Sequence, residues 1–376
     1  MIKRAVLLLI IMSFLSRVSW PAEIHLGRIS LPSGFTIHVY GRNIPDARSL
    51  ARGDKGTIFV GSRKRGNVYA LVDKDGDFRA DEVITVASGL HMPNGIAFKG
   101  GDLYVAELKR IVRFPQIENN LRNPPEPVTV YEGLPEKTHH GWKYLGFGPD
   151  NLLYFTLGVP CNVCRKKDRR FGTIMRINPD GGTPEIYARG IRNSVGFDFN
   201  PATGVLWFTD NGRDWLGDDS PPDELNRVQR NGLHFGFPEC HGMDIPDPIF
   251  GREGSCEKYT PPVLEMGAHV APLGLRFYRG KMFPPSYWNQ IFIAEHGSWN
   301  RTIPVGYRIL LVTHKGGKVL GKRVFAKGWL EGGKSWGRPV DLLNMPDGSL
   351  LLSDDKSGTV YRIFYSANNK GVEREQ

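Results

Sequence analysis

Residues 188–226 place a cation, an amide and an acidic loop close together in the sequence. The stretch reads ARGIRNSVGFDFNPATGVLWFTDNGRDWLGDDSPPDELN, with Arg192 and Asn193 just before an apolar strand. A second apolar strand leads into the loop 210–214, which offers carboxylates and backbone carbonyls. A guanidinium binds carboxylates through paired hydrogen bonds, and hard metal ions prefer oxygen ligands. The stretch therefore predicts a site that grips an anionic, metal-bound organic ligand. The alternative is that Arg192 only ties a strand entry to a neighbouring acidic loop.

His139 and His140 form a second group with chemical potential, in THHGWKYLGFGPDNLLYFTLG. The pair stands just before another apolar strand. An imidazole titrates near neutral pH, so it can accept a proton from a hydroxyl group. A histidine with a surface or packing role is the alternative reading of the same residues.

An internal repeat supplies the elements that must position these side chains. Each copy has a short apolar strand, a polar turn with Gly, Asp or Asn, and a second apolar or aromatic strand. The copies occupy residues 48–62, 93–107, 143–158, 195–212, 273–297 and 339–354. Third strands follow several copies, beginning near Gly66, Lys109, Gly172, Tyr307 and Gly358. Alternating β-branched and aromatic residues between turn residues indicate β-hairpins, and helical periodicity is nearly absent.

Six copies at this spacing predict an all-β, six-bladed β-propeller. We expect residues 23–376 to form this one domain, with an insertion at about 217–272 on one face. Because a propeller brings the inner strands of all blades to one funnel, residues next to these strands can meet although they are far apart in sequence. The candidates for this funnel are Arg63, His140, Arg192, Asp210, His269, His296 and Arg338.

The pattern ARGxRN…TGxLW…DELN, followed over about 31–364, resembles the soluble sugar dehydrogenases that depend on pyrroloquinoline quinone (PQQ). Their general base stands eight residues before a Gly-Pro-Asp turn, and His140 holds that place before Gly148-Pro149-Asp150. The resemblance implies that His140 takes the proton of the sugar C1 hydroxyl. It also implies that Arg192 and Asn193 contact PQQ, whose three carboxylates suit a guanidinium.

The resemblance extends to a calcium ion that polarises the quinone. By position, the backbone carbonyls of Gly212 and Arg213 are its ligands. The family commonly has proline where Arg213 stands. Arg338 matches the first arginine of a Gly-Arg-x-Arg-Asp motif, but the second arginine is replaced by Val340.

Other segments are more similar to the L-sorbosone and pyranose dehydrogenase branch. They are HGSWNR at His296, where the bacterial soluble enzymes have a lysine nearby, HVAPLGLRFY at His269, and MPNGIAF at Met92. This branch contacts its quinone with a different set of His, Arg and Trp side chains. The further cofactor-binding candidates are Arg63, Asp210, His269, His296, Trp299 and Arg301. Trp299 could stack on the quinone or serve only in packing.

Four cysteines occur in the chain, and three pairings of them are possible. We favour the two local pairs, Cys161 with Cys164 and Cys240 with Cys256, because each lies in a loop rich in Gly and Pro. The alternatives for Cys161-x-x-Cys164 are a haem attachment, a zinc site or a thioredoxin-like site. Arg165 follows the second cysteine where haem attachment needs histidine, no further zinc ligands are evident, and no helix begins there.

The first residues are typical of a targeting segment. Lys3 and Arg4 precede an apolar run over 5–15, which is short for a membrane span and suits a signal peptide of residues 1–22. We expect a periplasmic or secreted protein, with an uncleaved anchor as the alternative and no other membrane span. The formal net charge is +10. The basic residues are scattered apart from 165–170, and export argues against nucleic acid as a partner.

These inferences favour an exported oxidoreductase that acts on CH–OH or aldehyde donors with PQQ and calcium. Its substrate is a sugar or an aldehyde such as sorbosone. The chain has no CxxCH motif, so an external acceptor, a cytochrome or a quinone, must take the electrons. Two other classes remain: a calcium-dependent lactonase of the propeller type, which does not need Arg192, and a binding propeller without catalysis.

Overall fold

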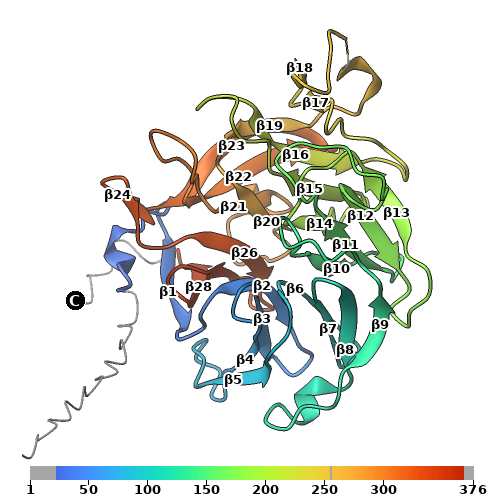
Figure 1. The fold of residues 1–376 in the computed structure, drawn as a ribbon. Coiled ribbons are helices and arrows are strands. Elements are labelled where there is room, and N and C mark those ends of the chain that lie inside the picture. The colour runs from blue at the N-terminus through green and yellow to red at the C-terminus, as the bar shows by residue number, and fades with distance from the viewer. Residues whose placement is uncertain (1–22, 255, 368–376) are drawn as a thin grey trace, which may run out of the picture.

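The chain folds into six four-stranded antiparallel sheets arranged in a ring (Figure 1). The computed structural model describes residues 23–254 and 256–367. The first strand of each blade lies at the centre of the ring, as the contacts of β2 with β6 and β26 and of β20 with β14 and β26 show. The predicted six-bladed β-propeller is thereby confirmed. The expected signal peptide, residues 1–22, lies outside the described residues.

The strands of each blade run outward from the central axis in chain order. Blade 1 contains β2 (Ala47–Arg52), β3 (Ile58–Ser62), β4 (Val68–Val72) and β5 (Glu82–Ala87). Blade 2 contains β6 (Gly95–Lys99), β7 (Asp102–Ala106), β8 (Arg110–Phe114) and β9 (Val128–Glu132). Blade 3 contains β10 (Leu145–Phe147), β11 (Leu153–Leu157), β12 (Thr173–Ile177) and β13 (Glu185–Arg189).

The second half of the chain continues the pattern. Blade 4 contains β14 (Phe197–Phe199), β15 (Leu206–Asp210), β16 (Pro222–Val228) and β19 (Leu264–Ala268). Blade 5 contains β20 (Pro272–Phe277), β21 (Ile291–Glu295), β22 (Arg308–Lys315) and β23 (Lys318–Lys327). Blade 6 contains β26 (Pro339–Asn344), β27 (Leu350–Asp354), β28 (Thr359–Tyr365) and, outermost, β1 (Phe35–Gly41). The strand β1 pairs with β28 from Phe35↔Tyr365 to Gly41↔Val360, which closes the ring.

The remaining elements are short. Two small hairpins, β17 (Cys240–His241) with β18 (Ile245–Pro246) and β24 (Leu330–Glu331) with β25 (Lys334–Ser335), lie outside the blades. The 3-10 helices are η1 (Leu26–Arg28), η2 (Ile117–Asn119), η3 (Cys256–Lys258) and η4 (Pro285–Tyr287). No helix within 23–254 and 256–367 is long and apolar enough to cross a membrane.

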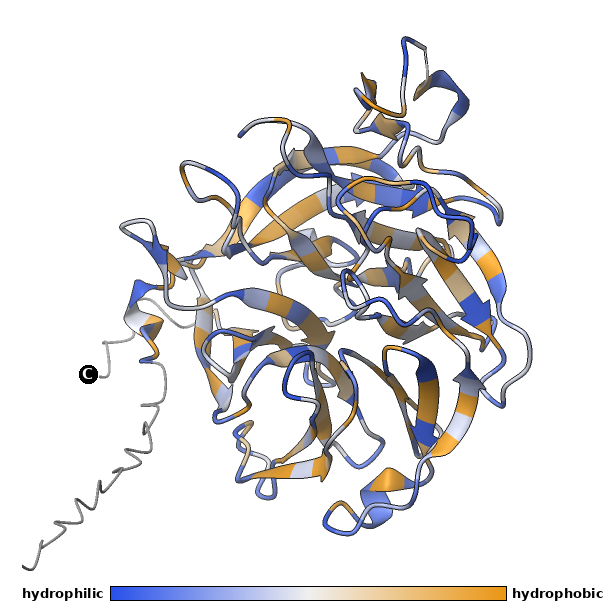
Figure 2. Cartoon of the chain, in the orientation of Figure 1, coloured by the Kyte–Doolittle hydropathy of each residue, from blue (hydrophilic) through white to orange (hydrophobic). Residues whose placement is uncertain are grey.

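Burial explains why the strands of one blade differ in sequence. The second strand β11 (LYFTL) is buried at every position, because neighbouring blades cover both of its faces. The outer strand β5 (EVITVA) alternates between exposed and partly buried residues, because one face meets water. The hydrophobic clusters lie between successive blades; one joins Ala97 and Tyr104 of blade 2 to Leu153 and Phe155 of blade 3. Figure 2 shows the corresponding bands of hydrophobic residues along the strands.

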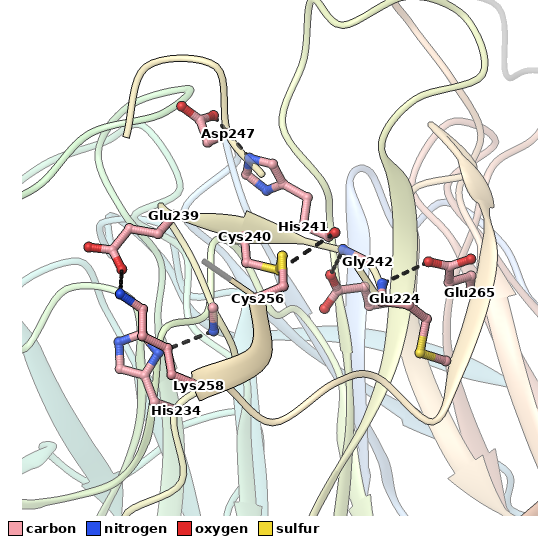
Figure 3. Close-up of a disulfide and its surroundings, with 12 residues drawn as sticks. Glu224, His234, Glu239, Cys240, His241, Gly242, Asp247, Cys256, Lys258 and Glu265 are labelled. Atoms are coloured by element: carbon pink, nitrogen blue, oxygen red, sulfur yellow. Dashed lines mark hydrogen bonds and ion pairs between the residues drawn. A yellow bond between two sulfur atoms is a disulfide. The ribbon is translucent and has the colours of Figure 1, made fainter. Parts of the chain in front are cut away.

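The insertion is shorter than the expected 217–272. Both β16 and β19 are regular strands of blade 4, so the excursion is confined to residues 229–263 between them. The sequence of β16 does not indicate a buried strand, because Asp223, Glu224 and Asn226 are polar although they are buried. Within the excursion, the hairpin β17–β18 is joined to η3 by the disulfide Cys240–Cys256 (Figure 3). The disulfide Cys161–Cys164 is the second one, so both predicted local pairings are confirmed.

Candidate functional site

The antiparallel blades bring two kinds of strand end to one mouth of the ring. Since the first and second strands of a blade are antiparallel, the start of the first lies beside the end of the second. Arg338 stands before the first strand β26, whereas Arg63 and His296 follow the second strands β3 and β21. This arrangement places chemistry-bearing loops from different blades around a common axis.

These loops surround a cavity of about 360 Å³ at the mouth of the ring. Residues from every blade except the second line it. Four arginines and four histidines contribute to its wall, namely Arg48, Arg63, Arg192, Arg338, His139, His140, His269 and His296. Polar residues of blades 4 and 5, Asn193, Asn211, Asp214, Asp223 and Asn300, line the same cavity. The wall is therefore mainly cationic and polar.

His140 is buried at the cavity wall in its neutral form. Burial, followed by the nearby charge of Arg192, lowers its pKa well below the usual value of 6.5. Its Nδ1 lies 2.9 Å from the carbonyl oxygen of Val159, and since a carbonyl only accepts, Nδ1 carries the hydrogen. The Nε2 atom is then the basic nitrogen. His139, by contrast, is exposed and contacts His140 edge-on at 4.1 Å between ring centroids.

Close backbone packing fixes the position of His140. Its φ of 50° lies in the left-handed region, which a residue with a Cβ adopts at a cost in strain. A Cβ atom on Gly158 would lie 2.8 Å from Cβ of His140 and 3.1 Å from Oδ1 of Asn193. Glycine at position 158 is therefore required for the two side chains to lie side by side.

The four arginines of the cavity are not equivalent. Arg48 forms an ion pair with Asp355 at 2.9 Å, and Arg192 forms one with Asp214 at 3.0 Å. Among the described residues, no carboxylate forms an ion pair with Arg63 or Arg338. The guanidinium of Arg63 lies 4.8 Å from the ring centroid of Trp142. The guanidinium of Arg338 donates to the carbonyls of His296 and Gly297. The charges of Arg63 and Arg338 are thus not neutralised by a paired carboxylate, which favours an anion in the cavity.

Asn162 holds Arg192 and Asp214 in place. Nε of Arg192 donates to the Asn162 carbonyl at 2.8 Å, and Nη2 donates to Oδ1 of Asn162 at 3.0 Å. The same Oδ1 accepts the backbone N–H of Asp214 at 2.8 Å, and Nδ2 of Asn162 donates to the Asp214 carbonyl at 3.1 Å. Asn162 lies inside the ring closed by the disulfide Cys161–Cys164, so the disulfide constrains this residue.

Asp210 does not line the main cavity, but it fixes the backbone of two residues that do. Its carboxylate accepts the backbone N–H groups of Arg192 at 2.8 Å and Asn193 at 2.6 Å. Asp223 similarly accepts the N–H of Gly212 at 2.7 Å. Burial raises the pKa of Asp210 to about 6, that of Asp223 to about 7 and that of Glu224 to about 8. A small second cavity beside the first is lined by Asp210, Gly212 and Glu224.

The two predicted metal-binding residues differ in position. Gly212 lines the main cavity, whereas Arg213 does not. The buried guanidinium of Arg213 binds Asp247 at 2.5 Å, and His241 binds the same carboxylate at 3.0 Å. Asp247 and His241 belong to the insertion, which the disulfide Cys240–Cys256 closes (Figure 3). The insertion therefore anchors the loop that follows β15.

His296 is part of a chain of polar contacts between blades. Its Nε2 lies 2.8 Å from Asp355, whose other oxygen binds Arg48. Arg48 in turn donates to Oδ1 of Asn94 at 2.7 Å. Burial lowers the pKa of His296 to about 4, and the adjacent Asp355 opposes that shift only in part. The chain joins blades 5, 6, 1 and 2 beneath the cavity.

The remaining candidates lie toward the rim. His269 lines the cavity, and its Nε2 lies 2.8 Å from the carbonyl of Gly217. Trp299 lines the cavity too, although its side chain is 67% exposed. Arg301 lies outside the cavity and donates to the carbonyl of Asp218 at 2.7 Å and to Asp219.

Of the predicted site residues, all except Asp210, Arg213 and Arg301 line the main cavity. Residues that contribute to the site but were not predicted are Arg48, Trp142, Asn162, Asn211, Asp214, Asp223, Asn300 and Asp355. Asp355 directly follows a second strand, as Arg63 and His296 do, so applying this repeat position to every blade would have found it. Arg48 lies inside the first strand β2, a position that none of the predicted candidates occupies. Asn162 gives no such signal, because it lies in an irregular loop.

Comparison with known proteins identifies the family. The family model described as "Glucose / Sorbosone dehydrogenase" matches residues 107–362. The chain belongs to the glucose/sorbosone dehydrogenase family. It is 34% identical over 367 residues to an uncharacterized protein of Borreliella burgdorferi, covering 93% of this chain and 94% of that protein. It is 24% identical to the aldose sugar dehydrogenase YliI of Escherichia coli, covering 67% of this chain and 68% of that protein.

Solved structures of sugar dehydrogenases share the fold. The holo form of the pyranose dehydrogenase PQQ domain from Coprinopsis cinerea superposes with a TM-score of 0.76 at 17% identity. That match covers 89% of this chain and 97% of that one. In this chain, Val340 packs with Val195 and Leu273 in a small apolar cluster on the axis, with Trp142 against it. Packing therefore accounts for the apolar residue that stands where the resemblance leads one to expect arginine.

Proposed function

We propose that this protein oxidises a sugar or an aldehyde at C1 with PQQ and calcium, outside the cytoplasm. The main support is the neutral, buried His140 at the wall of a cavity that carries two unpaired arginines. The electrons would pass to an external acceptor, a cytochrome or a quinone. When bound, PQQ supplies the acceptor of the substrate hydride and calcium polarises it.

The cavity suits a flat anion with several carboxylates. Arg63 and Arg338 offer positive charge without protein carboxylates as partners. Three buried atoms of the wall, Nε of Arg63, Nε1 of Trp142 and Oδ1 of Asn193, have no hydrogen-bond partner among the described residues. Unsatisfied buried polar groups are costly, so a bound ligand that satisfies them gains affinity. These residues would hold PQQ, and Arg192 would complete the cationic wall.

The oxygen-rich loop after β15 suits a calcium ion. The carbonyls of Gly212 and Arg213 are the proposed ligands, and calcium accepts such carbonyls readily. The carboxyl groups of Asp210 and Glu224 line the small neighbouring cavity, so further oxygen atoms lie beside Gly212. Because Asp247 neutralises the guanidinium of Arg213, the positive charge of that side chain is compensated away from the main cavity.

His140 would take the hydroxyl proton of the substrate on Nε2 while C1 is oxidised. The Val159 carbonyl fixes the tautomer with the hydrogen on Nδ1, so Nε2 is left as the nitrogen that can accept a proton. Because burial and Arg192 keep the pKa of His140 low, the imidazole is unprotonated at neutral pH. An aldose would give a lactone, and a hydrated aldehyde would give an acid.

The test is reconstitution of the purified protein with PQQ and calcium, followed by dye-linked oxidation of aldoses and aldehydes. The variant His140→Asn should bind PQQ, seen as a quinone absorbance that co-elutes with the protein, but lose about 10²- to 10⁴-fold in kcat. The matched control is His91→Asn, an exposed histidine outside the cavity wall, which should change kcat less than about threefold. Equal loss in both variants would remove the assigned role of His140.

The same preparation separates the other two classes. A calcium-dependent lactonase would hydrolyse lactones with calcium alone and would tolerate Arg192→Met. A binding propeller would show neither reaction. Oxidation that requires both PQQ and calcium supports the dehydrogenase, and no bound quinone after reconstitution would refute it.

A further inference from the structure

Two exposed tryptophans form a pair at the rim of the cavity. Trp215, in the loop after β15, is 69% exposed, and Trp299, in the loop after β21, is 67% exposed. Their rings meet edge to face, with centroids 5.6 Å apart and planes at 87°. Large aromatic side chains are normally placed where their apolar area is covered, so two adjacent exposed indoles mark a binding surface.

The pair is held by polar contacts between its two loops. Nδ2 of Asn300 donates to Asp214 at 2.6 Å, and Arg301 donates to the carbonyl of Asp218 at 2.7 Å. The N–H of Thr302 is shared between both carboxylate oxygens of Asp218 at 3.2 Å. These contacts fix the residues on either side of Trp215 and Trp299. The tryptophans are therefore presented by a preorganised base, and binding need not order them first.

The surface is continuous with the cavity. Trp299 lines the cavity and touches Trp215, which lies farther out. Polar and charged residues lie close to the pair, with Asp214, Asn300 and Arg301 among them. The path from the cavity outward therefore passes from cationic groups to aromatic faces with polar groups at their edges.

We propose that Trp215 and Trp299 form an outer subsite that binds the second and following sugar units of an oligosaccharide whose reducing end enters the cavity. A pyranose ring has an apolar face of C–H groups and a polar rim of hydroxyls. Indole faces cover the former, and nearby amide, guanidinium and carboxylate groups bind the latter. A substrate of one sugar unit would not reach Trp215.

This inference rests on the proposed function for the choice of a sugar with a reducing end. It goes beyond that proposal by predicting how activity depends on the length of the sugar chain. The KM should fall from a monosaccharide to a trisaccharide of the same sugar. The two indoles in contact offer a small apolar area of the size of a pyranose face, whereas a protein-docking patch would present a larger continuous apolar area.

The test compares glucose with maltotriose and cellotriose, and xylose with xylotriose, on the reconstituted enzyme with a small dye as acceptor. At least one trisaccharide should have a lower KM than its monosaccharide. Trp215→Ala should lower kcat/KM for that trisaccharide about tenfold and leave the value for the monosaccharide within about twofold. Trp215→Phe should restore most of the loss, because an aromatic face returns. The control is Trp288→Ala: Trp288 is 41% exposed, but follows η4 between the end of β20 and the start of β21, at the opposite end of blade 5.

Two results would overturn the subsite. One is the absence of any preference for a trisaccharide over its monosaccharide. The other is a loss in Trp215→Ala that appears only with a protein acceptor, which would make the pair a docking surface for that acceptor. Failure of the proposed function is distinguishable, because trisaccharide binding is measured separately by calorimetry on the protein without turnover. Binding that Trp215→Ala weakens supports the subsite even if no sugar is oxidised.

Discussion

Replacing Asn162 with alanine removes three side-chain hydrogen bonds from the site without touching the cavity wall itself. Two of them join neutral groups, the backbone N–H and carbonyl of Asp214, and are each worth about 1 kcal/mol. The third comes from the Arg192 guanidinium and is worth about 1.5–3 kcal/mol, but Nη2 of Arg192 keeps its bond to Asp214. Because of that remaining bond, the third contribution is counted as about 1 kcal/mol, and the combined loss is about 3 kcal/mol. If about half or more of this free energy is lost from transition-state stabilisation because Arg192 moves, kcat/KM falls about 10- to 100-fold.

The assay is steady-state oxidation by the reconstituted Asn162→Ala variant, together with its affinity for PQQ. A displaced Arg192 weakens the cationic wall, so PQQ should bind more weakly in the variant. The matched control is Asn178→Ala, which removes an Asn side chain that caps the turn at Asp180 between β12 and β13. Should Asn162→Ala retain both wild-type kcat/KM and wild-type PQQ affinity, the inference that Asn162 positions Arg192 is refuted.

Further substitutions test other parts of the site. Gly158→Ala should shift His140, 2.8 Å from the new Cβ, and lower kcat at least about tenfold with little change in the unfolding midpoint; an unchanged kcat contradicts the close-approach argument. The folded-state pKa of His296, about 4, lies below its ordinary 6.5, so the unfolded state binds more protons between these values. The contribution of His296 to the free energy of unfolding is therefore fully present above pH 6.5 and is lost as the pH falls to 4. The difference in unfolding free energy between wild type and His296→Gln should therefore change by about 3 kcal/mol over that window in urea titrations; a constant difference would show that His296 does not titrate there. Arg213→Met should lower the free energy of unfolding by about 3 kcal/mol, because the buried carboxylate of Asp247 loses its guanidinium partner and keeps His241 as its side-chain partner. An unfolding free energy equal to that of the wild type would show that the ion pair is not stabilising.

Repetition made most of the fold predictable, and the same repetition led to the site. The position of Arg63, His296 and Arg338 beside the inner strands placed them in one funnel before any geometry was known. The start of the insertion was misjudged because β16 buries Asp223 and Glu224, so its sequence does not have the apolar pattern of a strand. Asn162 could not be predicted, since its contacts to Arg192 depend on how an irregular loop folds over blade 4.

The pairing of β1 with β28 has a consequence for the order of events in the cell. During synthesis, β1 emerges first and must wait for the last strand of the chain before blade 6 can close. Arg338 and Asp355 also emerge late, and blade 6 brings them to residues made much earlier, such as Arg48. The site is thus completed only after nearly the whole chain has left the ribosome. A chain that stops before β28 leaves the ring open, so activity itself reports that translation has reached the end of the propeller.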